Sequence, residues 1–138
     1  MGLLRTTLKN DLGEMKRINS ALIEFLSEEG VPPSDVQRVR LVAEELLVNI
    51  IRHGFEANTA HTITLTLQTG PRRVTVTTED DGVPFDPRDA PPPPIGRPLE
   101  EQGDGGRGVY LIKQMTTSLE YARNGNRNRV SAIVEYGT

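Results

Sequence analysis

The stretch EELLVNIIRHGF at residues 44–55 decides how the rest of this chain is interpreted. Its apolar residues continue a three- and four-residue spacing, which predicts one long helix that ends near Gly54. At 100° per residue, Glu45 and Asn49 lie about 40° apart and are neighbours opposite the apolar face, whereas Glu44 points about 140° away from Asn49. A carboxylate beside a carboxamide can orient a hydroxyl and hold a hard cation such as Mg²⁺. The same pair is also typical of an ordinary polar helix face. The predicted apolar face comprises Val36, Val39, Ala43, Leu46, Leu47, Ile50 and Ile51.

The segments on either side of this stretch alternate between helical and strand patterns. Residues 11–29 have helical spacing that stops at Gly30, and a cap at Ser34 or Asp35 is expected to start the second helix. Strands are expected at residues 3–9, 62–69, 118–123 and 129–136 and around Val74 and Val76, with a short helix at 108–115. This order predicts an α+β domain, a mostly antiparallel sheet with helices on one face.

Composition limits the class of protein. With 138 residues, of which 36% are apolar, the chain is expected to form a single domain, residues 1–138. No membrane span is expected, and the absence of cysteine excludes disulfides and thiolate metal sites. A net charge of −3 argues against direct binding of nucleic acid, and the short basic cluster at Arg123, Arg127 and Arg129 is expected to be solvated surface. A cytoplasmic location is the simplest expectation.

Two further segments carry candidate chemistry. Asp80-Asp81-Gly82 follows a predicted strand, where glycine lets a flat ligand approach while a carboxylate accepts a hydrogen bond from an amine; Asp-Gly is also a common turn. Residues 103–108, spelled GDGGRG, precede a predicted helix and can present backbone N–H groups to phosphate oxygens. They also satisfy Gly-x-Gly-x-x-Gly, but no strand near the start of a parallel sheet precedes them.

The segment between these two is rich in proline and glycine. Residues 82–106 hold seven of the ten prolines and five of the thirteen glycines. A linker to a second domain is disfavoured, because only about thirty residues follow. A lid or binding loop, at about residues 87–106, is the preferred interpretation.

Taken in order, these three motifs resemble the N, G1 and G2 boxes of the GHKL (HATPase_c) ATPases, and most closely the anti-sigma factor serine/threonine kinase group. The details that favour this group are Glu45-x-x-x-Asn49-x-x-x-His53-Gly54-Phe55, Asp80-x-Gly82-x-Pro84-Phe85-Asp86-Pro87 and residues 105–112, GGRGVYLI. The resemblance covers about residues 5–136 and implies the Bergerat ATP-binding fold, a two-layer α/β sandwich.

The resemblance also implies roles for individual residues. Glu45 would be the general base, and Asn49 would ligate the Mg²⁺ that bridges the phosphates of ATP. Asp80 would accept a hydrogen bond from the adenine amino group, Gly82 would give the base room, and Ser131 would face adenine. Gly106 and Gly108 would donate backbone N–H groups to phosphates, and Arg107 would meet the γ-phosphate. Further residues expected at the nucleotide are Arg52, His53, Pro84, Phe85, Gly105 and Val109.

By this resemblance the chain is an ATP- and Mg²⁺-dependent serine/threonine protein kinase of bacterial partner switching. Its substrate would be a STAS-domain anti-anti-sigma protein. It would also sequester a sigma factor or another regulator, as a homodimer through its N-terminal strand and helix. One alternative is a module that uses ATP as a switch and transfers no phosphate. A sensor histidine kinase fragment is disfavoured, because neither His53 nor His61 heads a suitable hairpin.

The sequence departs from the family pattern in two places. The stretch Met115-Thr116-Thr117-Ser118 stands where many relatives carry an aspartate after the methionine. The predicted lid contains four consecutive prolines, Pro91 to Pro94, which favour a stiff extended segment.

Overall fold

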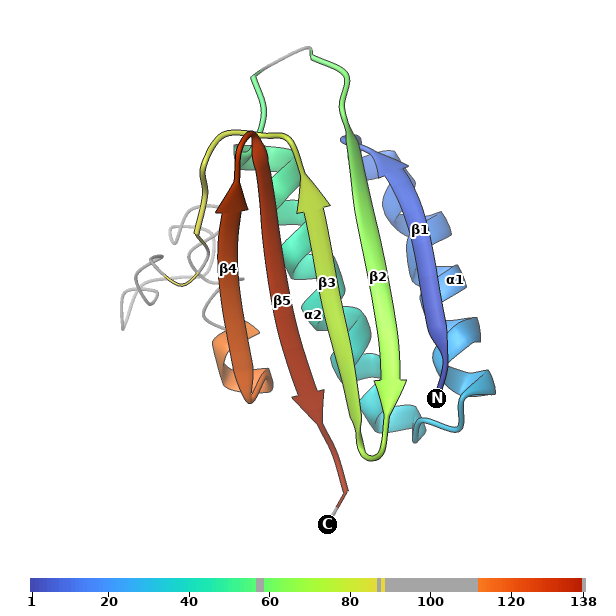
Figure 1. Cartoon of the computed structure of the whole chain (residues 1–138). Coiled ribbons are helices and arrows are strands. Elements are labelled where there is room, and N and C mark those ends of the chain that lie inside the picture. The colour runs from blue at the N-terminus through green and yellow to red at the C-terminus, as the bar shows by residue number, and fades with distance from the viewer. Residues whose placement is uncertain (57–58, 87, 89–111, 138) are drawn as a thin grey trace, which may run out of the picture.

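A sheet with two long helices on one of its faces makes up the described part of the chain (Figure 1). The computed structural model describes residues 1–56, 59–86, 88 and 112–137. Its elements are β1 (Leu3–Lys9), the 3-10 helix η1 (Leu12–Glu14), α1 (Met15–Glu28), α2 (Pro33–His53), β2 (Thr62–Gly70), β3 (Arg73–Asp80), β4 (Ser118–Asn124) and β5 (Arg127–Glu135). The strand order is β1-β2-β3-β5-β4, and each neighbouring pair is antiparallel. The expected α+β architecture, a two-layer sandwich, is confirmed.

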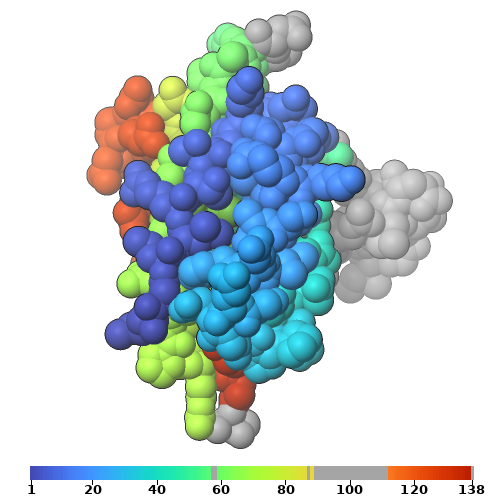
Figure 2. Space-filling view, turned by 90° about the vertical axis from the view of Figure 1, so that its right-hand side faces the viewer, coloured from blue at the N-terminus to red at the C-terminus, as the bar shows by residue number. Residues whose placement is uncertain are grey.

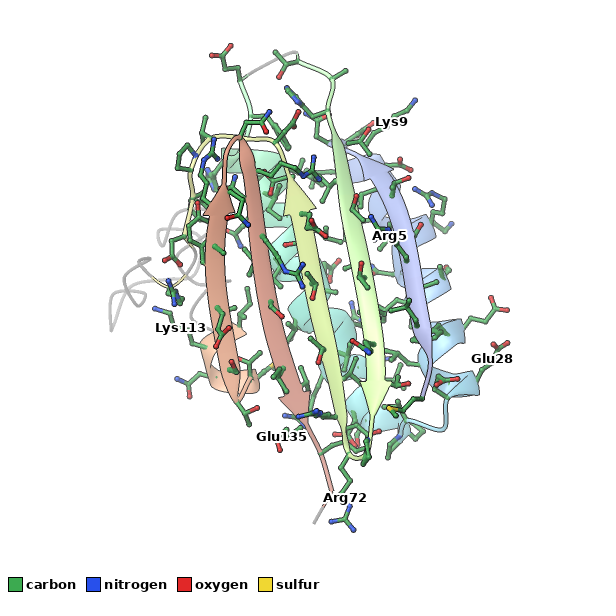
Figure 3. All side chains as sticks on the ribbon, viewed as in Figure 1. Arg5, Lys9, Glu28, Arg72, Lys113 and Glu135 are labelled. Carbon is green, nitrogen blue, oxygen red and sulfur yellow. The ribbon has the colours of Figure 1, made fainter. Side chains whose placement is uncertain are left out.

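Alternation along the strands decides which face of the sheet is covered. In β2, Ile63, Leu65 and Leu67 are buried, because successive side chains of a strand point to opposite faces and these three point towards the helices. The helices contribute fully buried side chains such as Leu22 and Leu47 to the same core. Figure 3 looks onto the helix-free face, where β1 presents Arg5.

The junction between the two helices differs from the sequence prediction. Gly30 ends α1 as expected, with a φ of +80° that favours glycine, and the Val31 N–H donates to the Leu26 carbonyl. The predicted cap at Ser34 or Asp35 is wrong: the N-cap is Pro32 and α2 starts at Pro33, two or three residues earlier than predicted. Proline suits the first helical position, since its missing N–H would have no partner there.

The two ends of the sheet have different surroundings. The C-terminal end of α2, the end of β3 and the β4–β5 hairpin meet at the upper end in Figure 1, while both chain termini lie at the lower end. Residues 112–115 are helical, in agreement with the end of the helix predicted at 108–115. The rest of that helix, and the predicted lid apart from Arg88, lie outside the described residues. None of the helices in the described ranges has the length and apolar character needed to cross a membrane.

Candidate functional site

A pocket lies at this upper end, between α2 and the core face of β3 and β5. Most of its lining is apolar, and three buried polar side chains interrupt it. The lining residues are Leu46, Asn49, Ile50, Gly54, Asp80, Val83, Phe85, Ile112, Asn128 and Val130. Two predicted motifs, the 44–55 stretch and the segment after residue 80, therefore contribute to one cavity.

Asp80 occupies the last core-facing position of β3. It shares that face with Val74 and Val76 and is only 2% exposed. Its Oδ1 accepts hydrogen bonds from the Gly82 N–H at 2.8 Å and from the Asn128 amide nitrogen Nδ2 at 3.1 Å. Within the described ranges no group donates to its Oδ2. A carboxylate oxygen in this state can accept a hydrogen bond from a ligand amine.

Two glycines bring the loop after Asp80 against the end of α2. The Val83 N–H donates to the Gly54 carbonyl at 2.8 Å. A Cβ on Gly82 would collide with that carbonyl oxygen, and a Cβ on Gly54 would lie 2.7 Å from the Ile50 carbonyl oxygen. Because both neighbours are backbone atoms, they cannot move aside as a side chain would. Glycine at both positions keeps the loop close to the helix end and the pocket open.

Asn49 lies inside the pocket wall, although a position on the polar face was expected. It is 3% exposed, and its Nδ2 donates to the Glu45 carbonyl at 2.7 Å. A carbonyl can only accept, so this contact assigns the amide nitrogen and turns Oδ1 away from it. Oδ1 is buried and has no hydrogen-bond partner among the described residues. An unpaired amide oxygen is a suitable ligand for Mg²⁺, so the donor present fits the ion that the resemblance implies.

The two neighbouring glutamates of α2 are engaged differently. The Glu44 carboxylate accepts from Arg40 at 3.0 Å and from the Asn19 amide of α1 at 3.5 Å. It therefore faces α1. Glu45 is half-buried and lies one turn before Asn49, about 40° from it around the helix.

Of the remaining predicted residues, some line the pocket, others lie outside it, and five are not described by the structure. Phe85 lines the pocket, and its ring centroid lies 6.5 Å from that of His53. Arg52 and His53 are exposed at the end of α2, and Pro84 lines a separate hollow on the other side of the loop. Five residues of the predicted phosphate segment lie outside the described residues: Gly105, Gly106, Arg107, Gly108 and Val109.

The structure contradicts the placement of Ser131 beside the nucleotide base. Ser131 pairs with Thr77 across β3 and β5, and their hydroxyl oxygens lie 3.4 Å apart on the helix-free face. The pocket lies on the opposite face. Strand parity explains the difference, because Val130 and Ala132 on either side of Ser131 are the residues that point towards the helices.

Sequence reasoning missed Asn128, which pairs with Asp80 in the β3–β5 register. It is 3% exposed and connects Asp80 with the loop beyond it. The alternation of Val130, Ala132 and Val134 along the strand could have indicated that Asn128 points to the same core face. Arg123 was expected to be solvated, but its guanidinium donates to the Gly82 carbonyl at 2.8 Å; Arg127 and Arg129 are exposed, as expected.

No group of three or more His, Cys, Asp or Glu side chains that could hold a metal occurs in the described part of the chain. The unpaired Oδ1 of Asn49 would then be one ligand of a bound Mg²⁺, and phosphate oxygens would have to complete the coordination.

Comparison with known proteins finds a matching ATPase domain family and a similar protein kinase. A family model, the histidine kinase-like ATPase domain, matches residues 8–134. Serine/threonine-protein kinase BtrW from Bordetella bronchiseptica is 34% identical over 91 residues, which make up 66% of this chain and 64% of that protein. The match thus spans less than two thirds of the relative's length.

Solved structures agree in fold. The RsbU and RsbW domains of a Mycobacterium tuberculosis protein align with a TM-score of 0.65 at 14% identity, over 98% of this chain and 32% of that one. The histidine kinase domain of a blue-light activated histidine kinase from Erythrobacter litoralis aligns with a TM-score of 0.54 at 23% identity. This alignment covers 89% of this chain and 59% of that one. The family match spans nearly the whole sequence, and the folds agree. The chain therefore belongs to the histidine kinase-like ATPase domain family.

Proposed function

We propose that this protein binds ATP with Mg²⁺ and transfers the γ-phosphoryl group to a serine or threonine of a protein partner. Membership of an ATPase domain family and the likeness to a serine/threonine-protein kinase support the reaction class. The observation that carries the proposal is the pocket itself. It combines the open acceptor Oδ2 of Asp80 with the unpaired amide oxygen of Asn49.

In the proposed mechanism, each described residue has one task. Asp80 accepts a hydrogen bond from the exocyclic amine of adenine, while Gly82 and Phe85 border the ring. Asn49 would hold Mg²⁺, which would neutralise charge at the phosphates. Glu45 takes the proton of the substrate hydroxyl while the hydroxyl oxygen bonds to the γ-phosphorus. At the same time the bond between the γ-phosphorus and the bridging oxygen breaks, and ADP leaves with that oxygen. Such transfer depends mainly on positioning and electrostatics, which a small set of residues can supply.

The proposed partners follow from the family resemblance. The substrate is a small STAS-domain anti-anti-sigma protein, and the chain also sequesters a sigma factor or another regulator. A second copy of the chain pairs along β1 and α1, which form most of the face seen in Figure 2. Leu3 on this edge is 65% exposed.

Calorimetry with ATP, with and without Mg²⁺, tests the nucleotide site. Asp80→Asn should weaken ATP binding at least about tenfold, because an amide can present its N–H₂ group to the amine where the carboxylate presents an acceptor. Asp81→Asn is the matched control: Asp81 is exposed, contacts His61 at 3.0 Å and should bind ATP as wild type does. A folded wild-type chain that binds no ATP would refute the nucleotide site.

Transfer to a STAS-domain partner, followed by radiolabelled phosphate, tests the reaction. Glu45→Gln should abolish transfer and retain ATP binding, because the loss of a general base affects the chemical step. Glu44→Gln should keep both activities, since Glu44 faces Arg40 and α1. If the wild type binds ATP but phosphorylates no such partner, the non-catalytic switch module becomes the better description.

A further inference from the structure

Asn128 uses all of its hydrogen-bonding capacity at the edge of the pocket. Its Nδ2 donates to Asp80 Oδ1 at 3.1 Å and to the Val83 carbonyl at 2.8 Å, with the Gly82 carbonyl at 3.4 Å. Its Oδ1 accepts from the Tyr121 hydroxyl at 2.6 Å and from the Arg123 guanidinium at 3.0 Å. A buried amide with every donor and acceptor paired is held in one orientation.

The neighbours of Asn128 determine which way its amide faces. A guanidinium has only donors, so the side of the amide towards Arg123 must be the oxygen. The nitrogen then faces Asp80 and the loop carbonyls, which can only accept. Arg123 also donates directly to the Gly82 carbonyl, so β4 holds both the amide and the loop.

This arrangement restricts what Asp80 can offer a ligand. Its Oδ1 already accepts from Gly82 and Asn128, and a proton on that oxygen would face two donors. These two contacts leave Oδ2 as the oxygen of Asp80 that a ligand can use, and the carboxylate form can only accept a hydrogen bond there. A ligand group at Oδ2 has to be a donor, such as the amino group at position 6 of adenine. A carbonyl oxygen at that position would face a carboxylate without an intervening proton.

We propose that Asn128, oriented by Tyr121 and Arg123, is a positioning residue that sets base specificity: it occupies Oδ1 of Asp80 and so presents Oδ2 to the base as the acceptor. It selects a base with an exocyclic amine over one with a carbonyl oxygen at the same position. The inference rests on the proposed nucleotide site. Among the described residues, the ionisable groups that face the Asp80–Asn128 pair are Tyr121 and Arg123 of β4; α2 contributes apolar side chains and Asn49.

The substitution Asn128→Asp tests this with little change in volume. It replaces the donor to Asp80 by a second carboxylate, and two adjoining carboxylates share a proton as the pH falls. Binding of ATP and inosine triphosphate is measured at pH 8 and pH 6. At pH 8 the variant should bind ATP at least about tenfold more weakly than wild type. At pH 6 the shared proton restores a donor, so ATP binding should recover in part.

The preference for ATP over inosine triphosphate should also fall in Asn128→Asp, because a proton on Asp80 can be donated to the carbonyl oxygen of hypoxanthine. A purely structural role for Asn128 would lower both affinities together and leave their ratio and pH dependence unchanged. Asn126→Asp is the control, since Asn126 is an exposed amide in the same hairpin. It should match wild type at both pH values.

Tyr121→Phe provides a second variant if Asn128→Asp does not fold. It removes one hydrogen bond to the Asn128 oxygen and should weaken ATP binding by a smaller factor, about threefold. An unchanged ATP preference and pH profile in Asn128→Asp, or, if that variant does not fold, unchanged ATP binding in Tyr121→Phe, would overturn the inference while the nucleotide site stands. If wild type itself binds no ATP, both proposals fail together, so the two failures are distinguishable.

Discussion

At the residue scale, two asparagines each have a buried amide oxygen, in different surroundings. Asn19 of α1 donates its amide to Glu44 of α2, and Asn49 donates to the Glu45 carbonyl. Both leave an amide oxygen buried and unpaired within the described ranges. Only Asn49 lines the pocket. Comparing variants of Asn19 and Asn49 therefore separates the effect of an unpaired amide oxygen on stability from its role in ligand binding.

Asn49→Ala should abolish the contribution of Mg²⁺ to ATP affinity. Its free energy of unfolding should stay within about 1 kcal/mol of wild type, because a lost hydrogen bond is offset by removal of an unpaired oxygen. Asn19→Ala should change neither ATP binding nor its Mg²⁺ dependence. Calorimetric titration of ATP with and without Mg²⁺, together with urea unfolding, measures both quantities. Full Mg²⁺ dependence in Asn49→Ala would remove this residue from the metal site.

At the element scale, β3 carries an internal contrast between its two faces. Thr78 points to the core, is fully buried and has a hydroxyl without a partner among the described residues. Its neighbour Thr77 points to the helix-free face, where its hydroxyl lies 3.4 Å from that of Ser131. The strand therefore contains one unsatisfied hydroxyl and one paired hydroxyl in adjacent positions.

Thr78→Val should raise the free energy of unfolding by about 1 kcal/mol, because a methyl group replaces a buried hydroxyl that makes no hydrogen bond. Thr77→Val should lower it by about 1 kcal/mol, because it removes the hydroxyl that pairs with Ser131. Urea unfolding of both variants measures the difference. Destabilisation by Thr78→Val would show that this hydroxyl has a partner in solution.

At the scale of the whole molecule, two carboxylates make stability depend on acidity. The Lys9 N–H, which donates to Glu14 at 2.9 Å, and then Arg17 hold the pKa of Glu14 below its usual 4.5. The Arg88 guanidinium, 2.7 Å from Asp86, holds the pKa of Asp86 below its usual 3.8. A lowered folded-state pKa means that the unfolded chain binds protons first as the pH falls.

The stabilisation from these two groups should be fully present above their usual pKa values and lost as the pH falls through the lowered ones. Unfolding by urea between pH 7 and pH 3 should show this loss. Glu14→Gln should start with a lower stability at pH 7 and lose less of it towards pH 3. If the free energy of unfolding falls equally steeply with pH in the variant and in wild type, the contact between Lys9 and Glu14 does not form in solution.

Local pattern was sufficient for most of the architecture. Helical spacing, the stop at Gly30 and strand alternation predicted the order of elements, because each depends on neighbours within a few residues. The motifs at Glu45, Asn49 and Asp80 could also be recognised in the sequence, because each is defined by the spacing of residues close together in the chain. The start of α2 was missed, because proline at a first helical turn competes with the usual caps.

Sequence patterns were enough to predict the fold class, the family resemblance and the candidate residues of α2 and β3. Tertiary packing set the pairing of β3 with β5, which brings Asn128 to Asp80 and turns Ser131 to the opposite face. It also decided that Arg123 holds Gly82 and that Asn49 is buried. The physical reason is that register between strands distant in sequence is set by packing of the whole core, and a shift of one residue exchanges the two faces.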